Sequence, residues 1–373
     1  MIFYLIELLL IISIKLLFKY RLKSPNGKII EGKDAFLGMS FVILFVTMAL
    51  RGATVGSDTS TYMDIFNKIA RSNSFGEAME VSTISSAPIY VGMHYVLSRF
   101  IKFTQISVVV NSAIIAIGFY YYIKKESSNY FDSVFLLYTL TLFFECMNGT
   151  RQFMAISLAL NSYVLLKENI KSLKGWTIFF IALGFHNTIV AFGIAILGIL
   201  FKNKMKSKEK AIFMSACFSA AITVGFTTAI NLVTAIFPYF QIYINGENKA
   251  QMFSSVGNGR ISILFIFLIF VIIGWIILNK RNSKAQNIDY VDLMNCLFCG
   301  FAGTIFATNI LFIRILWPFM CIYIVFFPNI IHTMSVKKRR FFHVVIMGVL
   351  LTYCILFLVE DKSGIIPYRL FWG

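Results

Sequence analysis

The chain has 373 residues, of which 58% are hydrophobic and 14% charged, with a formal net charge of +17. A soluble domain of this size could not bury so much apolar surface, and the short alternating strands of a transmembrane barrel are absent. The composition therefore predicts an all-α, polytopic integral membrane protein. The positive charge does not indicate nucleic-acid binding, because the basic residues lie in short clusters between apolar runs, as in cytoplasmic loops.

The first part of the chain contains apolar runs long enough for four full transmembrane helices. We expect these helices over residues 2–18, 35–50, 107–123 and 130–144. A fifth stretch, 87–101, has only about 15 residues and carries a proline, a histidine and an arginine. This stretch predicts a re-entrant or interfacial helix on the outer side, because two full crossings between the loop after residue 50 and the basic cluster at 124–125 would leave that cluster on the wrong side of the membrane.

The rest of the chain predicts six further spans and one hairpin. Residues 175–201 are too many for one crossing and too few for two, and residues 184–188 interrupt the apolar run. We expect a hairpin of two short helices with His186 near its outer tip. The remaining spans are expected over 152–166, 211–237, 261–278, 291–310, 311–331 and 342–358. The total is about ten full helices plus the short ones, in a single transmembrane domain covering residues 1–373.

Lysine and arginine clusters predict which loops share a side of the membrane. By the positive-inside rule, the basic clusters face the cytoplasm at 19–33, 124–125, 167–174, 202–210, 280–284 and 337–340. Both termini and the loops 51–86 and 238–260 then lie outside. These two loops are rich in Ser, Asn, Gly and Tyr, residues that hydrogen-bond neutral polar ligands.

Three arginines occur at or inside the outer ends of apolar helices: Arg51, Arg151 and Arg314. A charge at the centre of a membrane helix costs about 2.5–3.5 kcal/mol on insertion scales, so such residues mark function or pairing. Their guanidinium groups match the geometry of phosphate. They predict a site for an anionic headgroup such as a lipid pyrophosphate. The alternatives are interfacial snorkelling and salt bridges to Asp58 and Glu145.

Asp58, Tyr62 and His186 are the other candidates for chemistry on the predicted outer side. If a helix begins near Ser57, Asp58 and Tyr62 are four positions apart and share a face, where they could bind sugar hydroxyls and Asp58 could accept a proton. The alternative for Asp58 is a stabilising charge in a first helical turn. For His186 it is a hydrogen bond to a backbone carbonyl. No carboxylate–histidine group has metal-ligand spacing, so we expect no metal and no other cofactor.

The motifs in chain order resemble the EpsG family of Wzy-like polymerases of O-antigen, capsule and exopolysaccharide. The resemblance rests on Arg51-Gly52 with Val55 to Phe66, Thr150-Arg151-Gln152, Phe185-His186-Asn187, Arg314 and Pro367-Tyr368. It spans nearly the whole chain. Asn187-Thr188 departs from the usual family pattern after the histidine.

The resemblance implies a metal-independent glycosyltransferase in the bacterial inner (cytoplasmic) membrane. Its substrates would be undecaprenyl-pyrophosphate-linked oligosaccharides, and it would transfer a growing glycan to a lipid-linked repeat unit at the periplasmic or outer face. Membrane lipids, a chain-length regulator and a flippase are the expected partners, and nucleic acid is not. We expect pyrophosphate binding by Arg51, Arg151 and Arg314, sugar binding by Tyr62 and Gln152, and catalysis by Asp58 and His186.

Two other functions share some of these features. An O-antigen ligase would use the same donor and outer-face arginines, but such ligases usually carry one large outer loop late in the chain, and the loop at 238–260 is small. A flippase or transporter would place charges near mid-membrane and show related halves. The polar residues of this chain gather on one predicted face instead.

Overall fold

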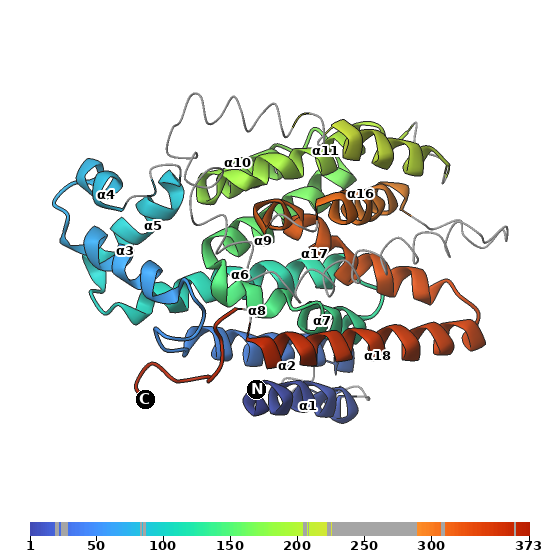
Figure 1. The fold of residues 1–373 in the computed structure, drawn as a ribbon, viewed down its shortest axis with the longest axis horizontal. Helices are drawn as coiled ribbons and strands as arrows, with labels where there is room; N and C mark the ends of the chain where they lie inside the picture. Colours follow the sequence, from blue (N-terminus) through green and yellow to red (C-terminus); the bar gives the residue numbers. More distant parts are fainter. Residues whose placement is uncertain are drawn as a thin grey trace. The chain divides into compact units, whose positions relative to one another are not determined.

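The computed structural model describes residues 1–18, 22–23, 29–82, 84, 87–203, 207, 209–221, 225, 289–306, 310–361 and 363–373 (Figure 1). The chain divides into two compact units, and each is considered by itself. The first unit holds residues 1–190 and 327–373, and the second holds residues 191–326. The described residues are almost entirely helical, which confirms an all-α membrane protein. A single transmembrane domain over the whole chain stays a prediction.

The first unit begins with two apolar helices that match the first two predicted spans. They are α1 (Ile2–Leu17) and α2 (Gly32–Ala49). Between them, the two-residue strands β1 (Leu22–Lys23) and β2 (Ile29–Ile30) pair antiparallel.

A buried glutamate joins α1 to its neighbours in the first unit. Glu7 Oε1 accepts a hydrogen bond from Thr47 Oγ1 in α2 at 2.5 Å, and its Oε2 accepts one from Tyr138 Oη at 2.9 Å. Tyr138 lies in α7 (Tyr130–Thr139). The carboxylate is tolerated inside the apolar layer because both oxygens have donors.

The predicted outer loop at 51–86 folds into two helices, α3 (Thr59–Arg71) and α4 (Phe75–Val81). The apolar side of α3 is buried, whereas the cap of α4 is polar, with the Ser74 hydroxyl accepting from the Glu77 N–H at 3.1 Å. The next helix, α5 (Pro88–Phe100), has only 13 residues and begins with proline in its first turn. Its short length agrees with the expectation that this segment does not cross the membrane fully.

The chain then crosses the first unit through α6 (Gln105–Glu126), which confirms a predicted span. The span predicted over 130–144 is a broken helix, which can still form one crossing. The structure has α7 (Tyr130–Thr139) and α8 (Leu142–Asn148), bent by 55° at the break between them. Thr141 adopts the left-handed backbone conformation, with φ 63°, and this interrupts the helical hydrogen-bond ladder.

The central helix of the first unit is α9 (Thr150–Glu168), which packs against α6 and α10 (Leu173–Phe185). A Cβ atom added at Gly118 of α6 would lie 2.6 Å from the Ser157 side chain, so glycine permits this close helix contact. His186 ends α10, and the 3₁₀ segment η1 (Asn187–Phe192) follows. The predicted interruption at His186 is confirmed, and the hairpin geometry stays a prediction.

The second unit contains α11 (Gly193–Leu200), a helix over residues 209–221, α16 (Tyr290–Phe306) and most of α17 (Ile310–His332). In this unit Phe298 and Phe319 hold α16 against α17, with ring centroids 4.8 Å apart. The predicted span 261–278, most of 211–237 and the loop 238–260 lie outside the described residues.

Near the end of the chain, α18 (Val336–Glu360) packs on α7, and the described residues that follow it, 361 and 363–373, form a non-helical tail. The tail returns to the start of the chain, where the Tyr368 and Phe3 rings stack with centroids 4.0 Å apart (Figure 1). It also pairs with residues 50–57 through four backbone hydrogen bonds of 2.8–3.2 Å. The N–H groups of Gly52, Gly56 and Ser57 donate to the carbonyls of Arg369, Gly364 and Ser363, and the Phe371 N–H donates to the Leu50 carbonyl.

Among the described residues, four helices are long and apolar enough to cross a membrane, or five if the bent α7–α8 pair forms one span. They are α2, α6, the Arg314–His332 part of α17, and α18. The predicted total of about ten full spans is therefore not confirmed. Several predicted crossings are shorter helices in the structure, and others fall outside the described residues.

The loops assigned to opposite faces gather at opposite ends of the first unit. We call one the tail end, where residues 51–58 and 145–151 meet the tail. At the other, which we call the basic end, Lys124 and Lys125 pair with Asp34 and Glu168 at 4.0 and 2.8 Å. Lys167 pairs with Glu126 at 2.5 Å. The grouping agrees with the charge pattern, while the assignment of the basic end to the cytoplasm stays a prediction.

The tail end depends on one glycine conformation. Gly56 has φ +87°, and an added Cβ would lie 2.5 Å from the Met147 carbonyl oxygen. We expect Gly56→Ala to lower the free energy of unfolding by about 2 kcal/mol or more, because both the backbone conformation and the space require glycine. Thermal unfolding of the purified protein in detergent measures this. Gly38→Ala is the control, since nothing lies within 4 Å of its added Cβ, and equal melting temperatures for the two variants would contradict the prediction.

Candidate functional site

Arg51 lies at the tail end, where it is 1% exposed and surrounded by protein acceptors. Its Nε donates to Thr59 Oγ1 at 3.2 Å, and its Nη2 donates to Thr150 Oγ1 at 3.0 Å and to the Met147 carbonyl at 3.4 Å. Its Nη1 donates to Ser112 Oγ at 3.4 Å and to the Met48 carbonyl. These acceptors belong to α2, α3, α6, α8 and α9, so one guanidinium joins five helices.

The Arg51 cation is held without a carboxylate in the described part of the chain. Neither of the expected partners, Asp58 and Glu145, forms an ion pair with it there. Burial lowers the pKa of Arg51 to about 10, so the side chain is still charged at neutral pH. Hydroxyl and carbonyl dipoles stabilise the charge in place of a carboxylate.

Arg151 lies in the first turn of α9, directly after Thr150, which accepts a hydrogen bond from Arg51. The hydrogen bonding of Arg151 differs from that of Arg51. Its Nε and Nη1 atoms are buried, and neither has a hydrogen-bond partner in the described part of the chain. A buried donor without a partner costs about 1–3 kcal/mol, and more when it is charged. The structure therefore presents a cation whose donors are available to an acceptor that the protein itself does not supply.

The surroundings of Arg151 contain further unmatched polar atoms. Tyr90 of α5 is buried, which raises its pKa, while the nearby Arg151 and Arg51 charges oppose the increase. Its hydroxyl accepts a hydrogen bond from Asn111 Nδ2 at 3.5 Å, but the other amide atom, Asn111 Oδ1, is buried without a partner. Tyr62 of α3 adds a second ring, with its centroid 6.1 Å from that of Tyr90.

His94 completes this group on α5. Its ring lies 4.2 Å from the Tyr90 ring, and its Nδ1 donates to the Tyr90 carbonyl at 3.0 Å. Burial lowers the pKa of His94 to about 4, so the ring is neutral at pH 7 and Nε2 is an acceptor. That Nε2 is buried and has no partner among the described residues. The polar cluster, which we define as Tyr62, Tyr90, His94, Asn111 and Arg151, thus offers both donors and acceptors.

Asp58 occupies the N-cap position of α3, one residue later than expected, and makes no side-chain cap bond. The Tyr62 N–H donates to the Asp58 carbonyl at 3.0 Å, so the two residues share a side of the helix start as predicted. Asp58 is half-buried, and its Oδ1 accepts from Ser57 Oγ at 3.5 Å. The carboxylate is therefore open to a ligand from solvent.

His186 and Gln152 are joined through Thr188. Gln152 Nε2 donates to Thr188 Oγ1 at 3.1 Å, and the Thr188 hydroxyl lies 2.8 Å from His186 Nδ1. The Thr188 backbone N–H also donates to Nδ1, at 3.3 Å. Because a backbone N–H can only donate, Nδ1 is the acceptor and a neutral His186 carries its proton on Nε2.

Arg314 belongs to the second unit and is half-buried in α17. Its guanidinium carbon lies 5.7 Å from the centroid of the Trp317 ring, a cation–π distance. The structure brings Arg51 and Arg151 together through Thr150. The membership of Arg314 in the same arginine group stays a prediction.

Three residues of this region were not identified from the sequence: Tyr90, Asn111 and Thr188. Asn111 had a usable signal, since a polar amide inside the apolar run 107–123 is expensive unless it has a partner or a function. Tyr90 had none, because one tyrosine among so many aromatic residues does not stand out. Thr188 was noted only as a departure from a motif, and the structure shows that it orients His186.

Comparison with known proteins gives one family. The family model described as the EpsG family matches residues 34–370. No curated protein and no solved structure shows a significant match to the chain. The matched range contains every candidate site residue named above and extends into the tail.

The contacts of Arg51 predict a structural requirement for arginine. We expect Arg51→Lys to lower the free energy of unfolding by about 3 kcal/mol, because an ammonium group keeps the charge but cannot reach acceptors on five helices. Thermal unfolding in detergent measures the loss. Arg71→Lys, on an exposed arginine at the end of α3, should change the stability by less than about 0.5 kcal/mol. An Arg51→Lys protein as stable as this control would refute the requirement.

Proposed function

The chain belongs to the EpsG family, and from this premise we propose that it is a polysaccharide polymerase that transfers a growing glycan from undecaprenyl pyrophosphate onto a lipid-linked repeat unit. The apolar helices and the family assignment make it a membrane protein of polysaccharide biosynthesis. The specific reaction and the residue roles are argued from the tail end of the first unit.

The observation that carries the proposal is that Arg151 Nε and Nη1 are buried without a hydrogen-bond partner among the described residues. These two charged donors fit a pyrophosphate. Its oxygens are anionic acceptors, and their spacing matches the fork of N–H groups on a guanidinium. The unpartnered acceptors His94 Nε2 and Asn111 Oδ1 fit the hydroxyl groups of a sugar. A glycosyl pyrophosphate has both kinds of group, and the polar cluster is complementary to both.

The proposed reaction is a displacement at the anomeric carbon of the donor. A hydroxyl oxygen of the acceptor sugar forms a bond to that carbon, and the bond from the carbon to the pyrophosphate oxygen breaks. Undecaprenyl pyrophosphate leaves with the bonding electrons, and the hydroxyl proton passes to a base. Negative charge grows on the leaving oxygen, and Arg151 lies where it would stabilise that charge without a metal.

The two arginines near the site divide their roles in this proposal. Arg151 contacts the leaving pyrophosphate, while Arg51 holds the helix ends that position it, because the donors of Arg51 are already bonded to protein acceptors. The positive charge of Arg51 still adds to the field at the site. Arg314 is proposed as a further pyrophosphate ligand.

Asp58 is the proposed general base, and Tyr62 on the same side of α3 is proposed to contact the sugar. A carboxylate that is open to solvent can accept the acceptor proton and release it. His186 is proposed to donate from Nε2 to a substrate oxygen, since its Nδ1 is already occupied by Thr188. Gln152 is proposed to act on the sugar and, through Thr188, to hold His186 in that orientation.

The cellular setting follows from the charge pattern. We place the basic end at the cytoplasm and the tail end at the periplasm or cell exterior of the bacterial inner membrane. In this setting about ten crossings would form one transmembrane domain. A chain-length regulator and a flippase are proposed partners, because the glycan must be supplied across the membrane and its length controlled.

Replacement of Arg151 tests the leaving-group role. We expect Arg151→Ala to fold but to lower polymerisation at least about 100-fold, the usual effect of removing one preorganised donor for a developing charge. Arg151→Lys should recover little, because it lacks the planar fork. The distribution of glycan lengths in a complemented deletion strain measures the loss, and single repeat units should remain. Arg71→Ala is the matched control for removing an arginine.

Two outcomes would contradict the polymerase proposal. Normal long polymer from the Arg151→Ala variant would contradict the proposal that Arg151 stabilises the leaving pyrophosphate. Loss of all surface glycan in the deletion strain, with no capped single units, would instead indicate a ligase or a flippase.

Replacement of Asp58 tests the base. We expect Asp58→Asn to reduce the polymerisation rate about 100-fold or more while leaving the stability unchanged, because the amide keeps the shape but cannot accept the proton. Asp64→Asn on the same helix is the control, since Asp64 is exposed and paired with Lys68 at 3.7 Å. Equal rates for the two variants, measured with purified lipid-linked substrate, would rule out Asp58 as the base.

A further inference from the structure

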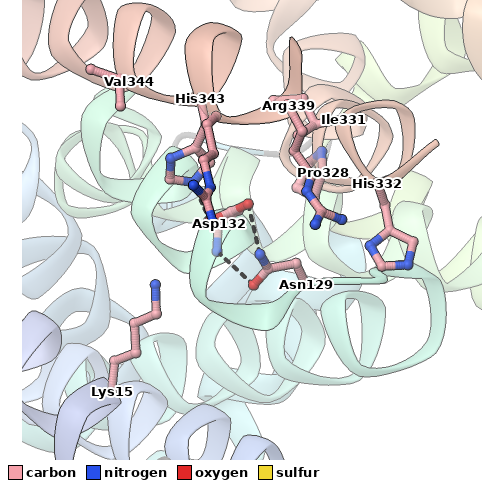
Figure 2. Close-up of a pocket in the computed structure, with 10 residues that line it drawn as sticks. Lys15, Asn129, Asp132, Pro328, Ile331, His332, Arg339, His343 and Val344 are labelled. Carbon is pink, nitrogen blue, oxygen red and sulfur yellow. Dashed lines mark hydrogen bonds and ion pairs between the residues drawn. The ribbon is translucent and has the colours of Figure 1, made fainter. Parts of the chain in front are cut away.

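A cavity of about 410 Å³ opens at the basic end of the first unit, and none of the residues that line it belongs to the polar cluster (Figure 2). It is bordered by the end of α1, the start of α7, the end of α17 and the start of α18. The charged and titratable side chains that line it are Lys15, Asp132, His332, Arg339, Arg340 and His343. No step of the proposed polymerase reaction uses these residues.

The cavity carries an excess of positive charge. Lys15, Arg339 and Arg340 are cations, whereas Asp132 is the only acidic residue in the lining. Asp132 is already satisfied, because its Oδ1 lies 2.9 Å from His343 Nε2 and its Oδ2 accepts from Asn129 Nδ2 at 2.7 Å (Figure 2). The cavity therefore favours an anion despite the single carboxylate.

The two arginines keep their guanidinium groups available. Neither Arg339 nor Arg340 forms an ion pair within the part of the chain that the structure describes. Both lie near the start of α18, whose N-cap Ser335 makes no side-chain cap bond. The helix dipole adds to the positive field there. Lys15 comes from the other side of the cavity, with its ammonium 3.4 Å from the Phe131 ring centroid.

The apolar surroundings favour a lipid over a free ion. A second cavity of about 310 Å³ shares Lys15 and Asn129 with the first. Three phenylalanines line it together with polar residues and a further cation, Lys33: they are Phe18, Phe36 and Phe131. On the α18 side, Val344 lines the basic cavity and is 71% exposed. An anionic phospholipid has a phosphate for the cations and acyl chains for these apolar surfaces, whereas inorganic phosphate would use only the cations.

We propose that this basic cavity binds the phosphate group of an anionic phospholipid from the leaflet at the basic end. Arg339 and Arg340 contact the phosphate from α18, and Lys15 contacts it from α1. The bound lipid then joins α1, α7 and α18 at the end of the unit opposite the polar cluster. This site is independent of the proposed polymerase function.

The test measures lipid binding to the purified full-length protein in a neutral detergent. Calorimetric titrations compare dioctanoyl phosphatidylglycerol, dioctanoyl phosphatidylcholine and inorganic phosphate. We expect phosphatidylglycerol to bind. Phosphatidylcholine should bind at least about tenfold more weakly, because its choline cation is repelled by the cations that line the cavity. The double variant Arg339→Gln with Arg340→Gln should weaken phosphatidylglycerol binding about tenfold or more, because two charged hydrogen-bond donors are lost.

A matched double variant separates the cavity from general surface charge. Lys337→Gln with Lys338→Gln removes the same charge from the preceding two residues, which do not line the cavity, and should weaken binding less than about threefold. Arg340→Gln alone, at an exposed position, repeats the test if the double variant does not fold. Equal losses in the two double variants would overturn the site. Binding of inorganic phosphate as tight as that of phosphatidylglycerol, or equal binding of phosphatidylcholine, would overturn the lipid as its ligand.

Discussion

The guanidinium cation of Arg51, buried without a carboxylate partner among the described residues, is the constraint on which the tail end of the first unit depends. Arg51 must keep its charge and satisfy its donors, and only hydroxyl and carbonyl oxygens from several helices are near enough to do so. This requirement fixes the start of α3 against the start of α9. It also fixes the segment after Arg51, where Gly52 and Gly56 allow the tail to pair closely with the backbone.

The same constraint explains how a second arginine can be left unsatisfied. The Thr150 hydroxyl accepts from Arg51, and the next residue, Arg151, lies in the first turn of α9, where the described residues supply no acceptor for its Nε and Nη1. A rigid frame is needed to hold such a group in place, because a mobile side chain would turn toward water. The pairing of a fully bonded arginine with a partly unbonded one separates positioning from binding, and it is the physical basis of the proposed pyrophosphate site.

The two ends of the first unit use their charges in different ways. At the tail end, Arg51 is held by many dipoles, whereas Arg151 keeps two buried donors without a partner among the described residues. At the basic end, lysines and arginines are numerous and pair with exposed acids or face a cavity. The first arrangement suits a preorganised reaction site, and the second suits contact with lipid headgroups. The long apolar helices between them keep these environments separate.

The sequence alone determined the all-α membrane class, several helices close to their observed bounds, and the grouping of loops into two ends, because apolar run length and lysine placement are local properties. It also identified the family, through motifs in chain order. Only the tertiary structure decided the bend at Thr141, the helices inside 51–86, and the partners of each arginine. Arg51 and Arg151 look alike in sequence, but the hydrogen bonds of Arg51 come from helices up to about a hundred positions away, whereas two buried donors of Arg151 have no partner among the described residues. Those long-range contacts, which no local pattern encodes, distinguish the cation that holds the fold from the one left open to a ligand.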